Sequence, residues 1–346
     1  MRSGIFARVT VEGSHTERAT YRGGRRDPDL DRPKVDVGVV TWNTGELTSA
    51  ALRRLLDTDQ GCQLRLLVRD NASTDGSAGI ISRVVPEAEI DAGSENLGFG
   101  AGMNRLLAKS TAPWFFILNS DAWPEPGAIR ALVDTARERQ GVAAVAPRVE
   151  RPDGTLEHTT YPFPSVKLAA LLAIRGSRIK KERAEGLLLE GAWKHDRPRS
   201  VDWAIGAALL VRRDAYLDIG GFDERFFMYV EDVDWCWRAR RRGWDIWFEP
   251  SALVRHIGNA SASQSYGLRR TKAYLSNTYW FFRREHGPFA SAAYRAWNLV
   301  GSTRLYLTAK RAGDEPRARV WRDHMVAAVT PSSRPYVLPR EDGSGS

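Results

Sequence analysis

Three carboxylate side chains follow directly on an aromatic run in the second half of the chain. The run occupies residues 226–229, and the acids are Glu231, Asp232 and Asp234. Aromatic neighbours shield a carboxylate from water and tune it toward general-base chemistry. Acids in the first turn of a helix also complement the helix dipole, and the arginines within 238–242 would complement its other end. Taken alone, this stretch leaves both a catalytic and a structural interpretation open.

The elements that must position these acids alternate between strand and helix. Apolar β-rich runs predict strands at 35–42, 64–69, 114–118 and 142–149, and helical patterns fall at 46–56, 98–110 and 126–139. Such alternation predicts a parallel sheet with helices on its faces. Ligands bind sheets of this kind outside the carboxyl ends of the strands. The polar residues at those ends are Thr41 to Asn43, Asp70-Asn71, Asn96 to Asn104, and Asn119-Ser120-Asp121.

Several of these polar residues also suit purely local structure. Residues 70–77 are rich in turn formers, so an Asx turn and a helix cap account for Asp75 without any ligand. Gly98, Gly100 and Gly102 do not have the spacing of a dinucleotide-binding fingerprint, which disfavours a nicotinamide enzyme. Asp121 follows a strand apolar enough to be central, where an acid can hold a divalent cation or, alternatively, cap a helix.

The composition of the chain limits the classes of protein and partner to be considered. The chain has 346 residues, 42% of them hydrophobic, and a formal charge of +9, which favours an anionic partner. No helix-turn-helix, zinc or RNA-binding signature accompanies that charge, so we expect no nucleic-acid partner. Cys62 and Cys236 form neither a disulfide framework nor a zinc pattern. With no signal peptide and no window near the ~20 apolar residues of a spanning helix, we expect the catalytic part in the cytoplasm.

Seven short blocks, in order between about Val37 and Ser261, resemble the inverting nucleotide-sugar glycosyltransferases of family 2, and within them the bacterial rhamnosyltransferase-like branch. The blocks are Val39 to Asn43, Asp70 to Ser77, Glu95 to Gly100, Leu118 to Ala122, Gly206 to Arg213, Gly220 to Phe227, and Glu231 to Asp234, followed by His256. The resemblance implies a GT-A fold, an α/β architecture with a Rossmann-like, mostly parallel sheet flanked by helices.

The resemblance also implies roles for individual residues. Asp70 would read the pyrimidine N3–H, with Thr41 and Asn43 beside the base and ribose, and with Asn96 and Gly98 contacting the nucleotide. Asp121 would be the last acid of the D-x-D motif and a ligand of Mg²⁺ or Mn²⁺, with Asn119 in place of the motif's first acid. His256 would complete the metal shell. Asp232 would be the catalytic base, and Glu231 its neighbour on the acceptor side.

Residue type and position alone suggest three further candidates for contact with the donor. Trp203 and Gly206 precede a strand ending at Arg212, which suggests a flat wall and open space for the donor sugar, although Trp203 equally suits a core. Arg238 lies on the helix begun by the acids and could reach a diphosphate. A surface salt bridge is the commoner fate of one arginine in a basic run.

The resulting expectation is a metal-dependent, inverting hexosyltransferase. The best-matching donor is dTDP-L-rhamnose, with UDP-galactofuranose, UDP-glucose and UDP-N-acetylglucosamine as alternatives, since an acid reading N3–H cannot distinguish uracil from thymine. A polyprenyl-diphosphate-linked or cell-envelope glycan is the expected acceptor. The alternatives of another class are a sugar-1-phosphate nucleotidyltransferase and a non-catalytic nucleic-acid-binding protein.

The expected organisation has four parts. These are a mobile leader over 1–34, the catalytic domain over 35–262, amphipathic helices over 263–330 and a polar tail over 331–346. Within the third part, helices are predicted at Tyr266 to Glu285 and Ala290 to Arg311. Their aromatic and cationic residues suit either a lipid headgroup surface or packing on the catalytic domain. We expect peripheral association with the inner face of the cell membrane.

Overall fold

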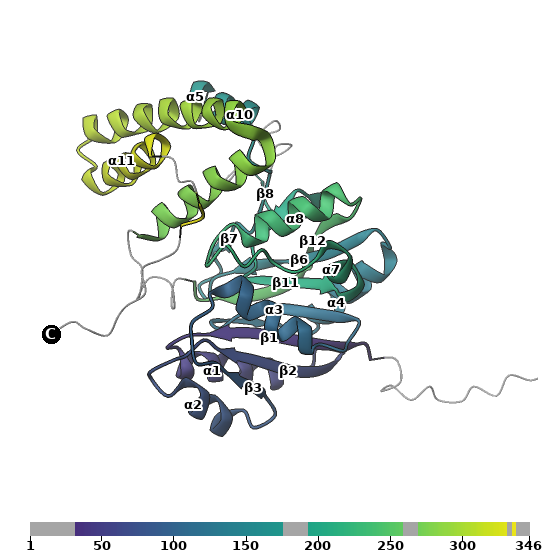
Figure 1. Ribbon diagram of the computed structural model, residues 1–346. Helices are drawn as coiled ribbons and strands as arrows, with labels where there is room; N and C mark the ends of the chain where they lie inside the picture. Colours follow the sequence, from purple (N-terminus) through teal and green to yellow (C-terminus); the bar gives the residue numbers. More distant parts are fainter. Residues whose placement is uncertain (1–31, 176–192, 259–268, 331–333, 337–346) are drawn as a thin grey trace, which may run out of the picture. The chain divides into compact units, whose positions relative to one another are not determined.

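The computed structural model describes residues 32–175, 193–258, 269–330 and 334–336 (Figure 1). The chain divides into two units, Met1–Arg32 and Pro33–Ser346, and every element below belongs to the second. The first 31 residues of the predicted leader, and most of the predicted tail, lie outside the described residues. The first strand begins at Lys34, one residue before the predicted boundary.

The main sheet follows the predicted α/β pattern and then departs from it. Its strand order is β3-β2-β1-β4-β11-β6-β12-β5, with β7 and β9 paired at the side of this path. The strands are β1 Lys34–Thr41, β2 Gln63–Asp70, β3 Glu89–Ala92, β4 Trp114–Asn119, β5 Ala122–Pro124, β6 Val142–Glu150, β7 Leu156–Glu157, β9 Arg199–Val201, β11 Ala208–Arg212 and β12 Asp245–His256. Strands β3, β2, β1 and β4 are parallel, whereas β11 inserts antiparallel between β4 and β6.

Alternating side chains of the strands build one hydrophobic core on each face of the sheet. Helices α1 Gly45–Leu56, α2 Ser77–Val84 and α4 Ala128–Glu138 pack on one face, for example through Leu52 and Ile129. Helices α3 Phe99–Lys109, α7 Arg213–Ile219 and α8 Glu231–Arg241 pack on the other, through residues such as Met103 and Trp235. These two layers hold the strand ends in place.

A helical region follows the sheet. Helix α10 spans Arg269–Arg311 and breaks at Gly287, where φ is 81° and Pro288 follows. The break falls between the two predicted helices, although the predicted start at Tyr266 lies outside the described residues. Helix α11, Glu315–Val329, was not predicted as an individual helix from the sequence. It packs along α10. Helix α5, Val166–Arg175, also packs on α10, and a small sheet pairs β8 Thr160–Tyr161 with β10 Trp203–Ala204.

A buried carboxylate joins the first strand to the turn before β4. Asp36 is 3% exposed. Its Oδ2 accepts hydrogen bonds from the Ser110 hydroxyl at 2.7 Å and from the backbone N–H groups of Thr111 and Ala112 at 2.9 and 3.1 Å. Three donors therefore depend on one carboxylate for their hydrogen bonds.

Replacing Asp36 with alanine should lower the free energy of unfolding by about 2–3 kcal/mol, because buried donors lose their acceptor. Urea unfolding followed by circular dichroism measures this change. Glu138→Ala is the control, since that side chain is 72% exposed and its loss should cost no more than about 0.5 kcal/mol. Equal effects of the two substitutions would contradict the assigned role of Asp36.

Candidate active site

A cavity of about 590 Å³ lies where strand ends of the sheet meet the start of α8 and the helical region. It is lined by ten of the twelve residues that the sequence singled out. These are Thr41, Asn96, Gly98, Asn119, Asp121, Trp203, Gly206, Glu231, Asp232 and His256. The predicted metal ligand Asp121 and the predicted base Asp232 thus line one cavity.

Strand pairing brings the predicted metal ligands together. Asp121 lies between β4 and β5, and His256 ends β12, whose antiparallel pairing with β5 sets His256 opposite Ala122. The His256 Nε2 atom is 3.1 Å from Asp121 Oδ1 and 3.3 Å from the Asn119 amide nitrogen. On the other side of the ring, Nδ1 is 2.8 Å from Oε2 of Glu157, on β7.

This environment changes the titration of the His256 ring. Burial disfavours the charged imidazolium, but hydrogen bonds and attraction from Asp121 and Glu157 outweigh burial and raise the pKa of His256 to about 9. Between its two carboxylates the ring is therefore an imidazolium at neutral pH.

The donor atoms at this point fit a divalent cation that keeps open coordination positions. Carboxylate oxygen and imidazole nitrogen are suitable ligands for Mn²⁺, and Mg²⁺ is commonly held by one or two carboxylates plus substrate phosphates. Among residues 32–175, 193–258, 269–330 and 334–336 there is no group of three His, Cys, Asp or Glu residues that could hold a metal ion. Asp121 and His256 supply one carboxylate and one imidazole, a donor set that leaves room for ligand oxygens around an ion.

Glu231 and Asp232 form an acidic pair at the start of α8. Asp232 Oδ2 accepts a hydrogen bond from the Gly206 N–H at 3.1 Å, and Oδ1 accepts one from the Val233 N–H at 2.8 Å. Burial outweighs these bonds and raises the pKa of Asp232 to about 6. Glu231 is 5% exposed and its Oε2 has no hydrogen-bond partner among the described residues. Burial and the charge of Asp232 raise the pKa of Glu231 well above its ordinary value.

The two acids consequently differ in the work they can do. Asp232 keeps two backbone donors that stabilise its charged form, so it is ionised at neutral pH yet more basic than an ordinary aspartate. It can accept a proton from a hydroxyl placed in the cavity. Glu231 resists ionisation, and its buried Oε2 has no hydrogen-bond partner among the described residues, so it suits a neutral neighbour of the charged Asp232.

The turn that carries this pair has an unusual backbone. Tyr229 and Val230 both have positive φ, 68° and 78°, although neither is glycine. Each left-handed residue of this kind costs on the order of 1–2 kcal/mol, and the β-branched Val230 is the less suited of the two. Gly98 packs against the same turn: at φ 83°, an added Cβ would lie 2.0 Å from the Phe227 carbonyl oxygen. Glycine at 98 lets the two loops touch.

Two of the predicted donor-binding residues do not line the cavity. Asn43 uses its side-chain oxygen to accept the Thr74 N–H at 2.8 Å, and its own N–H donates to the Ser73 hydroxyl. Asp70 is 5% exposed and accepts the Ser73 N–H at 3.0 Å. Both residues shape the loops after β1 and β2, and direct contact with a nucleotide stays a prediction for each.

Other predicted residues also have structural partners. The Thr41 hydroxyl lies 2.9 Å from that of Thr48. Asn96 accepts the Gly98 N–H at 2.9 Å. Asp75 accepts the Ser77 N–H at 2.9 Å, as expected for a turn residue. Trp203 is 5% exposed and its indole stacks on Tyr161, so it packs in the core as well as lining the cavity.

The third acid and the nearby arginine form an ion pair. Asp234 is fully buried and lies 2.8 Å from the Arg238 guanidinium. Arg238 also donates to the carbonyls of Ile219 and Gly221. Arg238 therefore forms a salt bridge, but with a fully buried acid instead of the surface partner expected from the sequence.

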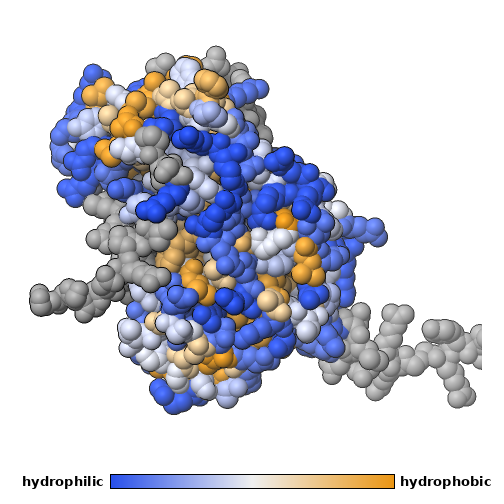
Figure 2. Space-filling model, in the orientation of Figure 1, coloured by the Kyte–Doolittle hydropathy of each residue, from blue (hydrophilic) through white to orange (hydrophobic). Residues whose placement is uncertain are grey.

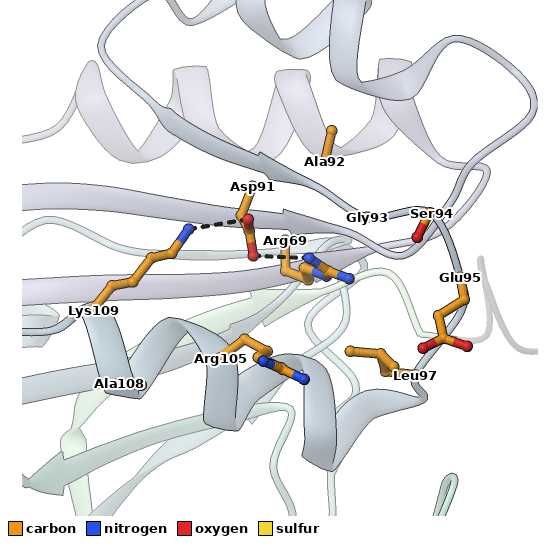
Figure 3. A pocket seen from close by; sticks show the side chains of 10 residues that line it. All are labelled: Arg69, Asp91, Ala92, Gly93, Ser94, Glu95, Leu97, Arg105, Ala108 and Lys109. Atoms are coloured by element: carbon orange, nitrogen blue, oxygen red, sulfur yellow. Dashed lines mark hydrogen bonds and ion pairs between the residues drawn. The ribbon is translucent and has the colours of Figure 1, made fainter.

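A second cavity, of about 500 Å³, lies beside the edge strand β3 and helix α3 (Figure 3). Its cations are largely matched by its own acids: Asp91 lies 2.8 Å from Arg69 and 3.0 Å from Lys109. Arg69 also donates to the Asn71 side chain at 3.3 Å, and Asn71 lines the first cavity. The charges here mainly fasten β2, β3 and α3 to one another.

Sequence reasoning missed several residues of the first cavity. Glu157 comes from a two-residue strand with no local motif. The helical region contributes Arg270, Thr271 and Tyr274 of α10 and His324 of α11. Their aromatic and cationic character was visible in the sequence, but nothing in it indicated that they face the strand ends.

Comparison with known proteins agrees with this architecture. The profile of the family Glycosyl transferase family 2 matches residues 36–200. An N-acetylglucosaminyl-diphospho-decaprenol L-rhamnosyltransferase of Mycobacterium tuberculosis is 32% identical over 292 residues, covering 78% of this chain and 91% of that protein. A mannosyltransferase of Pyrobaculum calidifontis, solved with GDP-Man and Mn²⁺, superposes with a TM-score of 0.55 at 17% identity, covering 87% of each chain. The GalNAc-T7 structure with UDP, GalNAc and Mn²⁺ gives 0.53 at 12% identity, covering 86% of this chain and 55% of that one.

The fold is that of a GT-A glycosyltransferase. At 32% identity with a relative covered over nine-tenths of its length, the chain belongs to glycosyl transferase family 2. Family membership selects the glycosyltransferase interpretation over the nucleotidyltransferase and nucleic-acid-binding alternatives.

In the metal-free protein, the His256 ring should titrate with a pKa of about 9 instead of 6.5, and Glu157→Gln should lower that pKa. Because the pKa of His256 is raised in the folded state, its pairing with the two carboxylates stabilises the folded protein. This contribution to folding stability is complete below about pH 6.5 and is lost as the pH rises through about 9. NMR of the imidazole protons measures both. Asp153→Asn, an exposed acid in the turn before β7, is the charge-matched control. A His256 pKa near 6.5 in the unmodified protein would overturn the assigned pairing.

Proposed function

We propose that this glycosyltransferase moves L-rhamnose from dTDP-L-rhamnose to a hydroxyl group of a sugar carried on a polyprenyl diphosphate. The observation that carries the reaction type is the meeting of the Asp121–His256 pair and the Glu231–Asp232 pair in one cavity. Support for the donor sugar and the acceptor comes from the mycobacterial relative, whose name states an L-rhamnosyltransferase acting on N-acetylglucosaminyl-diphospho-decaprenol.

In this proposal Asp232 acts as the general base. The acceptor hydroxyl gives its proton to Asp232 while its oxygen forms a bond to the anomeric carbon. The bond from that carbon to the diphosphate breaks in the same step, and the nucleoside diphosphate leaves with the bonding electron pair. One displacement of this kind inverts the anomeric configuration. Backbone donors at Gly206 and Val233 orient the carboxylate for the transfer.

Asp121 and His256 are the residues that would hold Mg²⁺ or Mn²⁺, and such an ion neutralises charge on a diphosphate leaving group. Holding it requires a neutral Nε2 on His256, so the proton that the ring carries between its carboxylates must first leave. Glu157 keeps the ring oriented through Nδ1.

Asp232→Asn should retain donor binding and lose transfer by at least about 10²-fold, because the amide cannot accept the proton. Thermal shift with dTDP-L-rhamnose, and with UDP-sugars as competitors, reports binding in Mg²⁺, Mn²⁺ or chelator. Transfer to a polyprenyl-diphosphate N-acetylglucosamine acceptor reports turnover. For the unmodified enzyme kcat/KM should fall as the pH drops through about 6, where Asp232 gains its proton.

Asp214→Asn, with its side chain 71% exposed on α7, is the matched control and should keep full activity. Near-normal turnover of Asp232→Asn would remove Asp232 from its role. A product with retained anomeric configuration would exclude the single displacement. Stabilisation by UDP-sugars and not by dTDP-L-rhamnose would exclude the proposed donor.

The helical region supports a further part of the proposal, contact with the inner face of the cell membrane. Apolar side chains are exposed on α5 and on α10 beyond its break, among them Ile174 at 60%, Val300 at 51% and Phe289 at 91%. Figure 2 shows hydrophobic surface over the helical region. Arg304 donates to the carbonyls of Ala173 and Ile174, which places a cation beside the exposed end of α5. Apolar side chains beside cations suit anionic lipid headgroups. Among the described helices, none is both long and apolar enough to span a bilayer.

The protein should bind vesicles containing phosphatidylglycerol at low salt, and Val300→Asp should weaken that binding roughly tenfold by removing apolar contact and adding repulsion. Co-sedimentation measures the partition. Val84→Asp on α2, a side chain of 39% exposure in the catalytic domain, is the control. If the unmodified protein ignores such vesicles at low salt, membrane contact through this region is excluded.

A further inference from the structure

The turn over residues 227–230 leads directly into the two cavity carboxylates. Its last two residues, Tyr229 and Val230, are the left-handed non-glycine residues described above, and Glu231 and Asp232 follow without a spacer. A rotation of the backbone at Val230 would therefore swing both carboxylates. A backbone held away from its preferred region stays there only when surrounding contacts enforce it.

Two contacts from different elements enforce this conformation. On the sheet side, the Phe99 N–H donates to the Phe227 carbonyl at 3.0 Å. On the other side stands Asn277 of α10, which is fully buried. Its Nδ2 donates to the Met228 carbonyl at 3.0 Å and to the Tyr229 carbonyl at 3.2 Å. One side-chain amide thus binds two successive carbonyl groups of the turn.

The Asn277 amide is itself oriented. Its Oδ1 accepts the backbone N–H of Tyr336 at 2.7 Å, so a residue near the end of the chain fixes which way the amide faces. Both ends of the amide are used, and the donor end faces the turn. Leucine has nearly the same shape but makes none of these bonds, and aspartate keeps the acceptor while losing the donor.

Helix α10 is fastened to α8 at further points. Arg284 pairs with Asp234, one turn into α8, and with Asp223 at 2.9 Å. Glu285 accepts the Trp237 indole N–H at 2.9 Å. These contacts fix α10 against α8, so Asn277 has a rigid support from which to hold the turn.

We propose that Asn277 is a positioning residue: by holding the Met228 and Tyr229 carbonyls it fixes the left-handed turn and thereby aims Asp232 at the acceptor hydroxyl. The inference rests on the proposed role of Asp232 but not on the identity of the sugar or the acceptor. Position 277 lies outside the segment matched by the family profile, which ends at residue 200. In this proposal the helical region positions the base and is not only a surface for partners.

The test compares Asn277→Leu and Asn277→Asp with the unmodified enzyme. Loss of the donor should lower kcat by about tenfold or more, since misplacement of a reacting group by about 1 Å can cost 10²-fold. The KM for donor should change less than about twofold, because the turn change leaves the Asp121 end of the cavity in place. The low-pH limb of kcat should shift as well, because the surroundings of Asp232 change. Rates are normalised to the protein fraction that binds donor.

Asn298→Leu on the same helix is the matched control. Its amide donates to the Tyr294 carbonyl at 2.8 Å, within the helix, and it does not line the cavity. A purely structural role for Asn277 would lower the folded fraction and leave kcat per folded molecule and the pH profile unchanged; that outcome would overturn the proposal. Asp232→Asn run in parallel separates the two hypotheses. If it stays active, the proposed base fails, and if it is inactive while Asn277→Leu and Asn277→Asp turn over normally, the positioning role fails.

A second substitution relieves the strain of the turn itself, so that Asn277→Leu can also be measured in a background that depends less on this side chain for folding. Glycine adopts a left-handed conformation without strain, so Val230→Gly should make the turn less dependent on Asn277. Asn277→Leu should then lower kcat by less than about threefold in the Val230→Gly background, against about tenfold in the unmodified chain, the coupling expected when both residues act on the conformation of one turn. Equal losses in both backgrounds would show that Asn277 does not act through the turn.

Discussion

Two neighbouring carboxylates in a largely buried corner repel each other, and this constraint governs the arrangement around them. Charging both would be costly, since neither burial nor a like charge favours ionisation. The structure separates their properties through the backbone: Asp232 accepts hydrogen bonds from the N–H groups of Gly206 and Val233, whereas one oxygen of Glu231 has no partner within the part of the chain that the structure describes. The position of β11 matters for this reason, because its insertion between β4 and β6 brings Gly206 to the cavity.

Many of the residues that line the first cavity could be predicted from the sequence, because a parallel sheet places the carboxyl ends of its strands together. The patterns located β1, β2, β4 and β6 to within a residue or so, and ten of the chosen residues line one cavity. What could not be predicted depends on contacts between distant segments. Glu157 reaches His256 across 99 positions, and Asn277 reaches Met228 across 49. The side chain of Asn43 bonds to the loop after β2, 31 positions away, a contact that no local motif reveals, whereas Asp70 bonds within its own turn-rich loop.

The sequence of the helical region does not indicate which of its residues pack and which are exposed. Its aromatic and cationic residues suited both a lipid surface and packing against the catalytic domain, and the structure shows which of its residues pack and which stay exposed. Asn277, Arg284 and Glu285 contact the turn and α8, while Ile174, Phe289 and Val300 stay exposed. Amphipathic periodicity alone cannot divide the residues in this way, because a helix that packs on one side and meets lipid on another carries apolar groups around most of its circumference.

Both edges of the sheet have a consequence for behaviour in concentrated solution. Strand β3 has only four residues, and its Glu89 and Asp91 are paired with Arg65, Arg69 and Lys109. At the opposite edge, β5 has three residues and ends at Pro124, which has no N–H to donate. Short, charged or proline-bearing edges are poor templates for pairing with a second chain. At high protein concentration, these edges therefore protect the chain against aggregation through its sheet.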